Sequence, residues 1–128
     1  MKKIIQTNNA PAAIGTYSQA VQVDKTVYIS GQIPLDPKTM NMVSADFSAQ
    51  AKQAFDNLKA IVEAAGGNFS HIVKLQIFLI DLENFSIVNN MMETFFEKPY
   101  PARAVVQVSR LPKEAMIEMD AVLYLGDL

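Results

Sequence analysis

The run "HIVKLQIFLI" (residues 71–80) sets the architecture of the chain. It is rich in β-branched and aromatic residues, and its second half is almost continuously apolar, which is typical of an interior strand. Leu75, Ile77 and Leu79 fall on one face of such a strand, whereas Phe78 falls on the other. We therefore predict an interior strand in a sheet that carries apolar side chains on both faces.

A helix is predicted before this strand, over residues 44–67, "SADFSAQAKQAFDNLKAIVEAAGG". We expect Ser44 or Asp46 to cap this helix and Gly66 to end it. Apolar side chains recur every three or four residues, as on one side of an amphipathic helix: Phe47, Ala51, Ala54, Leu58, Ile61 and Ala65. The other side is expected to face water and carries Gln50, Lys52, Gln53, Asn57 and Lys59.

A second amphipathic helix is predicted after the strand, over residues 82–98, with Asp81 as its cap. One side of this helix carries Phe85, Val88, Met92 and Phe95. The other β-prone segments are residues 20–26 and 27–34, for which we predict a hairpin, and residues 103–108 and 116–125, joined by a turn at 109–115.

The predicted order is strand, strand, helix, strand, helix, strand, strand, which favours one α+β domain over residues 1–128. The simplest arrangement is one mixed sheet with both helices packed on one face, because each amphipathic helix must bury its apolar side. Two helices do not cover both faces of the sheet, and an uncovered apolar face usually meets another subunit. We therefore expect an oligomer.

The composition excludes several classes of protein. Half of the 128 residues are hydrophobic, and the net charge of −2 gives no basic surface for nucleic acid or an acidic membrane. The chain has no cysteine and therefore no disulfide or thiolate site. The N-terminus lacks the apolar centre of a signal peptide, and no stretch approaches the about 20 apolar residues of a membrane span. We expect a cytoplasmic protein.

Arg103 is a charged residue at the start of an apolar strand. If residues 109–115 close a hairpin, Arg103 lies within a few residues of Glu118 and Asp120 on the next strand. One interpretation is a surface ion pair, worth roughly 0.2–1 kcal/mol. The other is a carboxylate-binding site, in which the guanidinium grips an anion with two parallel N–H donors and a glutamate positions or deprotonates a water.

Weaker candidates lie elsewhere in the chain. Ser30 and Gly31 end a predicted strand, where glycine lets a ligand approach the backbone, although an ordinary turn has the same pattern. Tyr17, in a glycine-containing loop, is either a packing residue or a ligand contact. His71 is the single histidine and opens a different strand, so we predict neither a Ser-His-Asp triad nor a metal site.

The segment "PARAVVQVSRLPKEAMIEMDA" (residues 101–121) closely resembles the C-terminal signature of the Rid family, the reactive-intermediate imine and enamine deaminases. That signature joins Pro-Ala-Arg, a short apolar strand, a Leu-Pro turn and an apolar-Glu-apolar triplet, here "IEM". Further segments follow the family's order over nearly the whole chain: "NAPAAIGTYSQAV", "YISGQIP" and "VKLQIFLIDLENFSIVN". The chain is similar to the RidA branch, whose members hydrolyse 2-imino acids.

The resemblance implies a chorismate-mutase-like α+β fold and a homotrimer with ligand clefts between subunits. In this family the matching arginine, Arg103, holds the substrate carboxylate. The backbone at Val105 helps to hold the substrate and the attacking water, and Glu118 engages that water. Tyr17 closes over the ligand. The implied binding residues are Tyr17, Ser30, Gly31, Asn89, Arg103, Ala104, Val105 and Glu118.

The implied substrates are 2-iminobutanoate and 2-iminopropanoate, released by dehydratases that act on threonine and serine, and the products are 2-oxo acids and ammonium. A protonated imine is already a strong electrophile, so we expect no metal, cofactor or covalent nucleophile. Two alternatives to an enzyme of this kind are a non-catalytic 2-oxo-acid-binding regulatory protein and an RNA-cleaving inhibitor of translation. The acidic pI of about 5.3 and the single histidine argue against the RNA-cleaving function.

The sequence departs from the family pattern in three places. Position 16 is Thr where the family usually has Pro, which is expected to loosen the loop that bears Tyr17. Val105 replaces a common Cys, with little expected loss because the contact is made by the backbone. The segment "FFEKPYPAR" (residues 95–103) is shorter than usual, which is expected to reshape the approach to Arg103.

Overall fold

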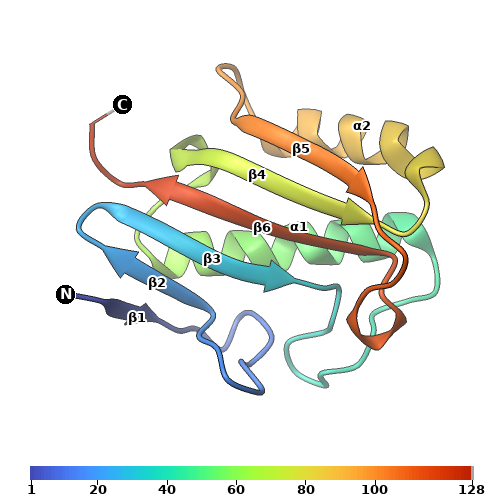
Figure 1. Cartoon of the computed structure of the whole chain (residues 1–128), viewed down its shortest axis with the longest axis horizontal. Coiled ribbons are helices and arrows are strands. Elements are labelled where there is room, and N and C mark those ends of the chain that lie inside the picture. The colour runs from blue at the N-terminus through green and yellow to red at the C-terminus, as the bar shows by residue number, and fades with distance from the viewer. Residues whose placement is uncertain (128) are drawn as a thin grey trace.

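Six strands and two α-helices make up the chain in the computed structural model, which describes residues 1–127 (Figure 1). The strands are β1 (Lys3–Ile5), β2 (Ala20–Val23), β3 (Thr26–Gln32), β4 (Ile72–Leu79), β5 (Ala102–Gln107) and β6 (Ile117–Tyr124). The helices are α1 (Phe47–Ala64) and α2 (Phe85–Phe95), and short 3-10 turns cover Phe69–His71, Leu82–Asn84 and Pro112–Glu114.

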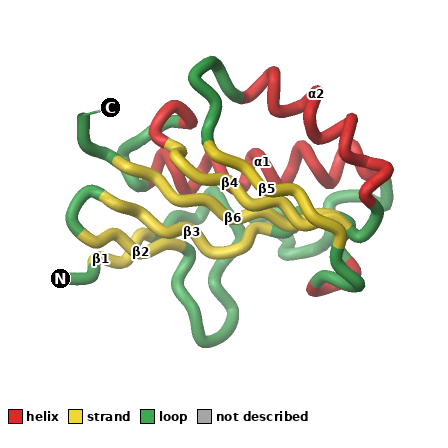
Figure 2. The backbone as a smooth tube through the Cα atoms, turned by 45° about the horizontal axis from the view of Figure 1, so that its top comes forward, coloured by secondary structure: helices red, strands yellow, loops and turns green. Residues whose placement is uncertain are grey.

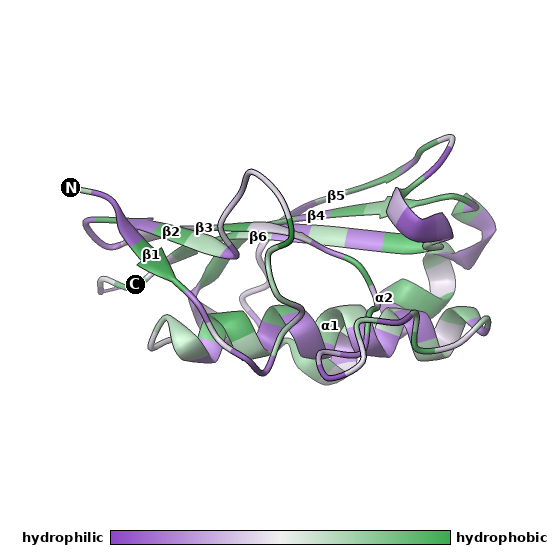
Figure 3. Cartoon of the chain, turned by 90° about the horizontal axis from the view of Figure 1, so that it is seen from below, coloured by the Kyte–Doolittle hydropathy of each residue, from purple (hydrophilic) through white to green (hydrophobic). Residues whose placement is uncertain are grey.

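All six strands belong to one mixed sheet, in the order β1-β2-β3-β6-β4-β5 (Figures 1 and 2). The β4–β5 pair is parallel and the other neighbours are antiparallel. β4 therefore has a partner on each side, which confirms the predicted interior strand. Both helices lie on the same side of the sheet (Figure 3), which confirms the predicted mixed α+β sheet with two helices on one face. β1 was not predicted, because its three residues carry too short a pattern.

The core lies between the two helices and the sheet face that they cover. Leu75 and Ile77 of β4 and Ile117 and Met119 of β6 are fully buried there. Burial of each large apolar side chain stabilises the fold by about 1.5–3 kcal/mol. From α1 the buried apolar side chains are Phe47, Ala51, Ala54, Phe55, Leu58, Ile61 and Val62. Asp46 caps α1 by accepting a hydrogen bond from the backbone N–H of Ala49, as one of the two predicted caps.

Within residues 1–127, no helix covers the opposite face of the sheet (Figure 3). It exposes apolar side chains on several strands, with Ile4, Tyr28 and Val106 each about half exposed. The strand register places Ile4 and Tyr28 on the same face, because both align with Val21 of β2. This exposure is what the sequence led us to expect of a face that meets another subunit. None of the described helices combines the length and the apolar composition that a membrane crossing needs.

The predicted hairpin between the last two strands is wrong. β5 and β6 are not paired, because β4 lies between them: Leu75 aligns with Arg103 on one side and with Ala121 on the other. The segment 109–115 therefore crosses the end of β4 and does not form a tight turn. Its length fits either connection, which is why the sequence pattern did not separate them.

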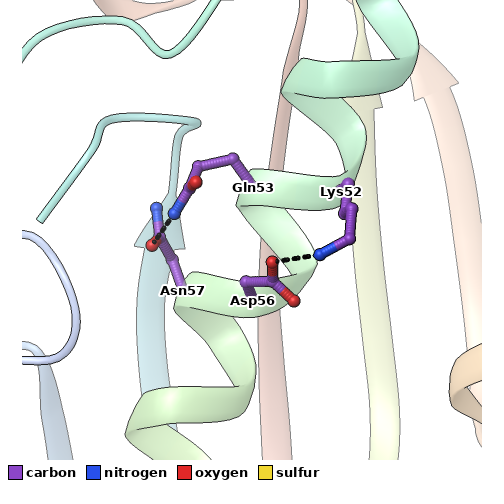
Figure 4. A network of polar contacts seen from close by, with 4 residues as sticks. All are labelled: Lys52, Gln53, Asp56 and Asn57. Atoms are coloured by element: carbon purple, nitrogen blue, oxygen red, sulfur yellow. Dashed lines mark hydrogen bonds and ion pairs between the residues drawn. The ribbon is translucent and has the colours of Figure 1, made fainter.

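The side of α1 that was predicted to be wet is partly buried. Gln50 accepts a hydrogen bond from the backbone N–H of Met116, and Asn57 is fully buried. The Asn57 amide donates to the carbonyls of Ile33 and Leu35, both at 3.0 Å. It also accepts a hydrogen bond from Gln53 Nε2 at 2.8 Å, which Figure 4 shows. The prediction failed because the loop after β3 packs on this side of the helix and needs donors for its carbonyl groups.

Asn57→Ala is expected to lower the free energy of unfolding by about 2–3 kcal/mol, because two carbonyls are left without donors in a buried site. Urea denaturation measures the loss. Lys52→Ala is the matched control on the same helix, because it removes only the exposed Lys52–Asp56 ion pair (Figure 4). That control is expected to cost less than about 0.5 kcal/mol. Equal losses for the two variants would contradict the buried role of Asn57.

Candidate functional site

Glu118, on β6, lines a hollow of about 490 Å³, the Glu118 hollow. Its polar lining comes from Glu118, Ser30, Gln32 and Lys113. Tyr17 lies at its wall with half of its surface exposed. The apolar lining includes Pro11, Ala12, Ile14, Ile33, Leu35 and Met40. The structure therefore brings together four of the residues named from the sequence: Tyr17, Ser30, Gly31 and Glu118.

An irregularity in β3 shapes this hollow. Ile29 pairs with Ala121 and Gln32 with Met119, so two residues, Ser30 and Gly31, lie opposite one residue of β6. Two residues opposite one define a β-bulge, a feature that is common beside active sites. The Ser30 hydroxyl donates to the carbonyl of Ser18 at 2.6 Å, so it holds the loop that bears Tyr17.

Gly31 makes room for the Glu118 carboxylate. A Cβ atom at position 31 would lie 2.6 Å from Glu118 Oε2 and 2.8 Å from its Cδ, which is closer than atoms in contact approach. The carboxylate therefore rests directly against the Gly31 backbone. The sequence suggested either a ligand contact or a turn for this glycine. In the structure, the missing side chain instead lets the Glu118 carboxylate of the same chain approach the backbone closely.

Gln19 is a site-supporting residue that sequence analysis missed. It is buried, and its Oε1 accepts a hydrogen bond from the backbone N–H of Thr7 at 2.7 Å. Its Nε2 donates to the carbonyl of Thr7 at 3.0 Å and to the carbonyl of Pro11 at 2.8 Å. These bonds hold the loop between β1 and β2, which forms one wall of the Glu118 hollow. A glutamine in a polar loop carries no pattern that predicts burial.

Glu118 and Asp120 lie on the same face of β6, two residues apart. Burial raises the pKa of Glu118 above its ordinary value, and the charge of Asp120 raises it further. Burial also raises the pKa of Asp120. A carboxylate with a raised pKa holds a proton more readily, which suits a group that takes up and returns protons.

Arg103, on β5, lines a second hollow of about 400 Å³, together with Asn89, Met92, Glu93, Tyr100 and Pro101. The guanidinium Nη1 donates to Asn89 Oδ1 at 2.9 Å and to the sulfur of Met92 at 3.4 Å. The guanidinium carbon also lies 5.1 Å from the centre of the Phe85 ring. Within residues 1–127, no carboxylate forms an ion pair with Arg103. Of the two interpretations of Arg103, the surface ion pair to Glu118 or Asp120 is therefore wrong.

The two hollows lie on opposite faces of the sheet. Arg103 aligns with the buried Leu75, so its side chain is on the helix-covered face, whereas Glu118 aligns with Phe78 on the open face. The two residues are two strands and three residues apart, which separates their Cα atoms by about 14 Å. One chain therefore does not place Arg103 and Glu118 around a single small ligand.

The backbone at Val105 is available for contact at the edge of the sheet. The N–H of Val108 donates to the carbonyl of Leu79, so β5 faces β4 with the backbone of its even-numbered residues. Because alternate residues of a strand point their N–H and C=O groups to opposite sides, the Val105 groups point away from β4. β5 is an edge strand, so these groups have no neighbouring strand in the part of the chain that the structure describes. Ala104 is half-buried, with its backbone turned toward β4.

His71 serves a local structural purpose. Its Nδ1 accepts a hydrogen bond from the backbone N–H of Asn68 at 3.0 Å, and the Asn68 side chain caps the same turn.

Asp81 was predicted to cap the second helix. It instead caps the 3-10 turn Leu82–Asn84, and α2 begins at Phe85. Phe85 lies next to Arg103 and is not part of the core.

Comparison with known proteins agrees with the sequence resemblance. The model of the family described as endoribonuclease L-PSP matches residues 7–125. A 2-iminobutanoate/2-iminopropanoate deaminase of Dermatophagoides farinae is 47% identical over 95% of both chains. The crystal structure of RidA from the Antarctic bacterium Psychrobacter sp. PAMC 21119 is 52% identical, with a TM-score of 0.92 and coverage of 95% of this chain and 98% of that one. The structure of E. coli TdcF with bound serine is 42% identical, with a TM-score of 0.92 and coverage of 97% and 99%. The chain therefore belongs to the endoribonuclease L-PSP family, in the group that contains RidA and the 2-iminobutanoate/2-iminopropanoate deaminases.

Proposed function

We propose that the chain hydrolyses reactive 2-imino acids and their enamine tautomers to 2-oxo acids and ammonium. The observation that carries the proposal is the guanidinium of Arg103, which lines a hollow. Among residues 1–127 only its Nη1 has hydrogen-bond partners, so its Nε and Nη2 donors can bind a carboxylate. The deaminase names of relatives such as the Dermatophagoides farinae protein point to the same chemistry. 2-Iminobutanoate and 2-iminopropanoate are the proposed substrates.

The active site is proposed to form between two copies of the chain, in a homotrimer. One copy contributes the Glu118 hollow, with Tyr17 over the ligand and Ser30 and Gly31 in the wall. Its neighbour contributes Arg103. The separation of Arg103 and Glu118 on opposite sheet faces supports this arrangement, as do the exposed apolar side chains of the open face. The neighbour also supplies Asn89, Ala104 and the free backbone groups of Val105.

The proposed reaction needs a held substrate and an aimed water. Arg103 binds the substrate carboxylate through parallel N–H donors. Glu118 accepts a proton from water as the oxygen bonds to C2 of the protonated imine and the C=N double bond becomes single. Glu118 then returns the proton to the nitrogen, and the C–N bond breaks to release ammonia. As the carbonyl forms, the hydroxyl proton passes to Glu118 and from there to the ammonia, which leaves the site as ammonium. Holding the reactants in line is worth up to roughly 7–11 kcal/mol in ideal cases.

The test is to generate 2-iminopropanoate with a serine dehydratase and to follow pyruvate release with and without the protein. Faster release supports the proposal, and an unchanged rate contradicts it. Binding of 2-oxobutanoate without faster release would instead favour the regulatory 2-oxo-acid-binding protein. The net charge of −2 does not favour the ribonuclease activity in the family's description, and binding of RNA that weakens steeply with salt would be needed to support it.

Gly31→Ala is expected to lower kcat by about 10²-fold, because the added methyl group displaces the Glu118 carboxylate from its place against the backbone. Fold stability should change little, since the displaced atoms are the end of a flexible side chain. Steady-state kinetics and thermal denaturation measure the two effects. In a Glu118→Gln background the same substitution should have almost no further effect on kcat. Independent, multiplicative losses would show that Gly31 acts by another route.

A further inference from the structure

We infer that α2 presents a neutral cradle, formed by Phe85, Asn89 and Met92, that fixes the Arg103 guanidinium without cancelling its charge. The inference deepens the proposed function, because it concerns how the carboxylate-binding group of that site is held. Phe85 and Met92 are assigned as positioning residues, and Asn89 acts on the substrate through Arg103.

The three cradle residues lie at spacings of four and three along α2, so they share one side of the helix. Each touches the guanidinium in a different way: the Phe85 ring at 5.1 Å, the Asn89 amide oxygen at 2.9 Å and the Met92 sulfur at 3.4 Å. Met92 is buried and therefore has little freedom to move. Three contacts from one rigid helix determine where the end of a long, flexible side chain lies.

None of the three contacts carries a negative charge. A carboxylate in place of one of these contacts would pair with the guanidinium and use up its forked donors and its charge. Glu93 lines the same hollow but forms no ion pair with Arg103 within residues 1–127. An aromatic face, an amide oxygen and a thioether attract a cation weakly and leave most of its donors free. The arrangement suits a guanidinium that must bind an incoming carboxylate.

Asn89→Asp is the sharpest test, because it keeps the size and the hydrogen-bonding oxygen of the side chain and adds the charge that the cradle lacks. Affinity for 2-oxobutanoate, measured by calorimetry, should fall by roughly tenfold or more, since the new carboxylate competes for Arg103. Asn90→Asp is the matched control: it makes the same change of charge on the neighbouring residue, which is exposed and lines a different groove. That control should bind within about twofold of the parent chain.

Phe85 is tested by the nature of its replacement. Phe85→Leu removes the ring and should weaken 2-oxobutanoate binding by roughly three- to tenfold, whereas Phe85→Tyr keeps the ring and should retain the parent affinity. In an Arg103→Ala background, where turnover is still measurable, Phe85→Leu should have no further effect on kcat/KM for 2-iminopropanoate. Leu82→Ala, at a similarly exposed apolar residue three positions earlier, controls for loss of surface area.

The outcomes separate the two proposals. The cradle is overturned if Asn89→Asp binds as Asn90→Asp does, or if Phe85→Leu and Phe85→Tyr bind alike, while thermal denaturation shows every variant folded. It is overturned as well if the parent chain does not bind 2-oxobutanoate. If the parent chain binds the oxo acid, the variants behave as expected and imine hydrolysis is absent, then the cradle stands and the proposed reaction is wrong.

Discussion

Arg103→Ala is expected to lower kcat/KM for 2-iminopropanoate by roughly 30-fold to 10³-fold and to abolish measurable binding of 2-oxobutanoate. The guanidinium is the proposed partner of the substrate carboxylate, and it lines a hollow with N–H groups free to receive it. Without it, a small anion has no strong attachment on this side of the site. The assay that couples a serine dehydratase to pyruvate release measures the rate, and calorimetry measures the binding.

Two variants control for this loss. Arg110→Ala removes an arginine of the same charge that is largely exposed and paired with Glu114, so it should leave the rate unchanged. Arg103→Lys keeps the charge but loses the forked pair of donors, so its rate should fall between the parent chain and Arg103→Ala. A full rate in Arg103→Ala would contradict carboxylate binding at this residue.

The sequence predicted which helices and strands form better than it predicted which strands pair with one another in the sheet. The apolar run 71–80 predicted the interior strand, because burial on both faces leaves a direct trace in composition. It did not reveal that β4 separates β5 from β6, since strand pairing depends on packing between segments far apart in the chain. For the same reason the residues around Arg103 and Glu118 were identified, while their distance from each other was predicted wrongly.

Buried polar groups were the second class of error. Asn57 and Gln50 sit at helix positions that the apolar pattern assigns to the wet side, yet both satisfy backbone groups of distant segments. Gln19 behaves in the same way in a loop. Each of these side chains bonds a backbone group that would otherwise be buried without a partner. Which backbone group that is depends on the segment that packs against the side chain, and only the fold reveals that segment. The sequence did predict Asp46 as a helix cap, because capping is a local contact.

Glu118→Gln is expected to lower kcat by about 10²-fold to 10⁴-fold while binding of 2-oxobutanoate is largely retained. The amide is similar in size to the carboxylate and still fits against Gly31, but it does not accept the proton of the attacking water. The combination of lost turnover and kept affinity distinguishes a proton-transferring group from a binding group. Rates and calorimetry on the same protein preparation measure both.

The pH dependence offers an independent check on Glu118. Its pKa is raised by burial and by the charge of Asp120. Because the ionised form accepts the proton, the rate should fall as the pH drops through this raised pKa. Asp120→Asn removes the neighbouring charge and lowers the pKa of Glu118, so the acidic limb of the kcat/KM profile should move to lower pH. A limb that stays in place would show that another group titrates there.

Mixing the two inactive variants tests whether Glu118 and Arg103 act from different chains. In an oligomer reassembled from equal amounts of Arg103→Ala and Glu118→Gln, about a quarter of the sites should combine an intact Arg103 from one copy with an intact Glu118 from its neighbour. Activity should therefore return to roughly a quarter of the parent value. A site formed inside one chain would regain nothing, because every chain in the mixture lacks one of the two groups. The opposite-face placement of the two side chains requires the first result if both belong to one site.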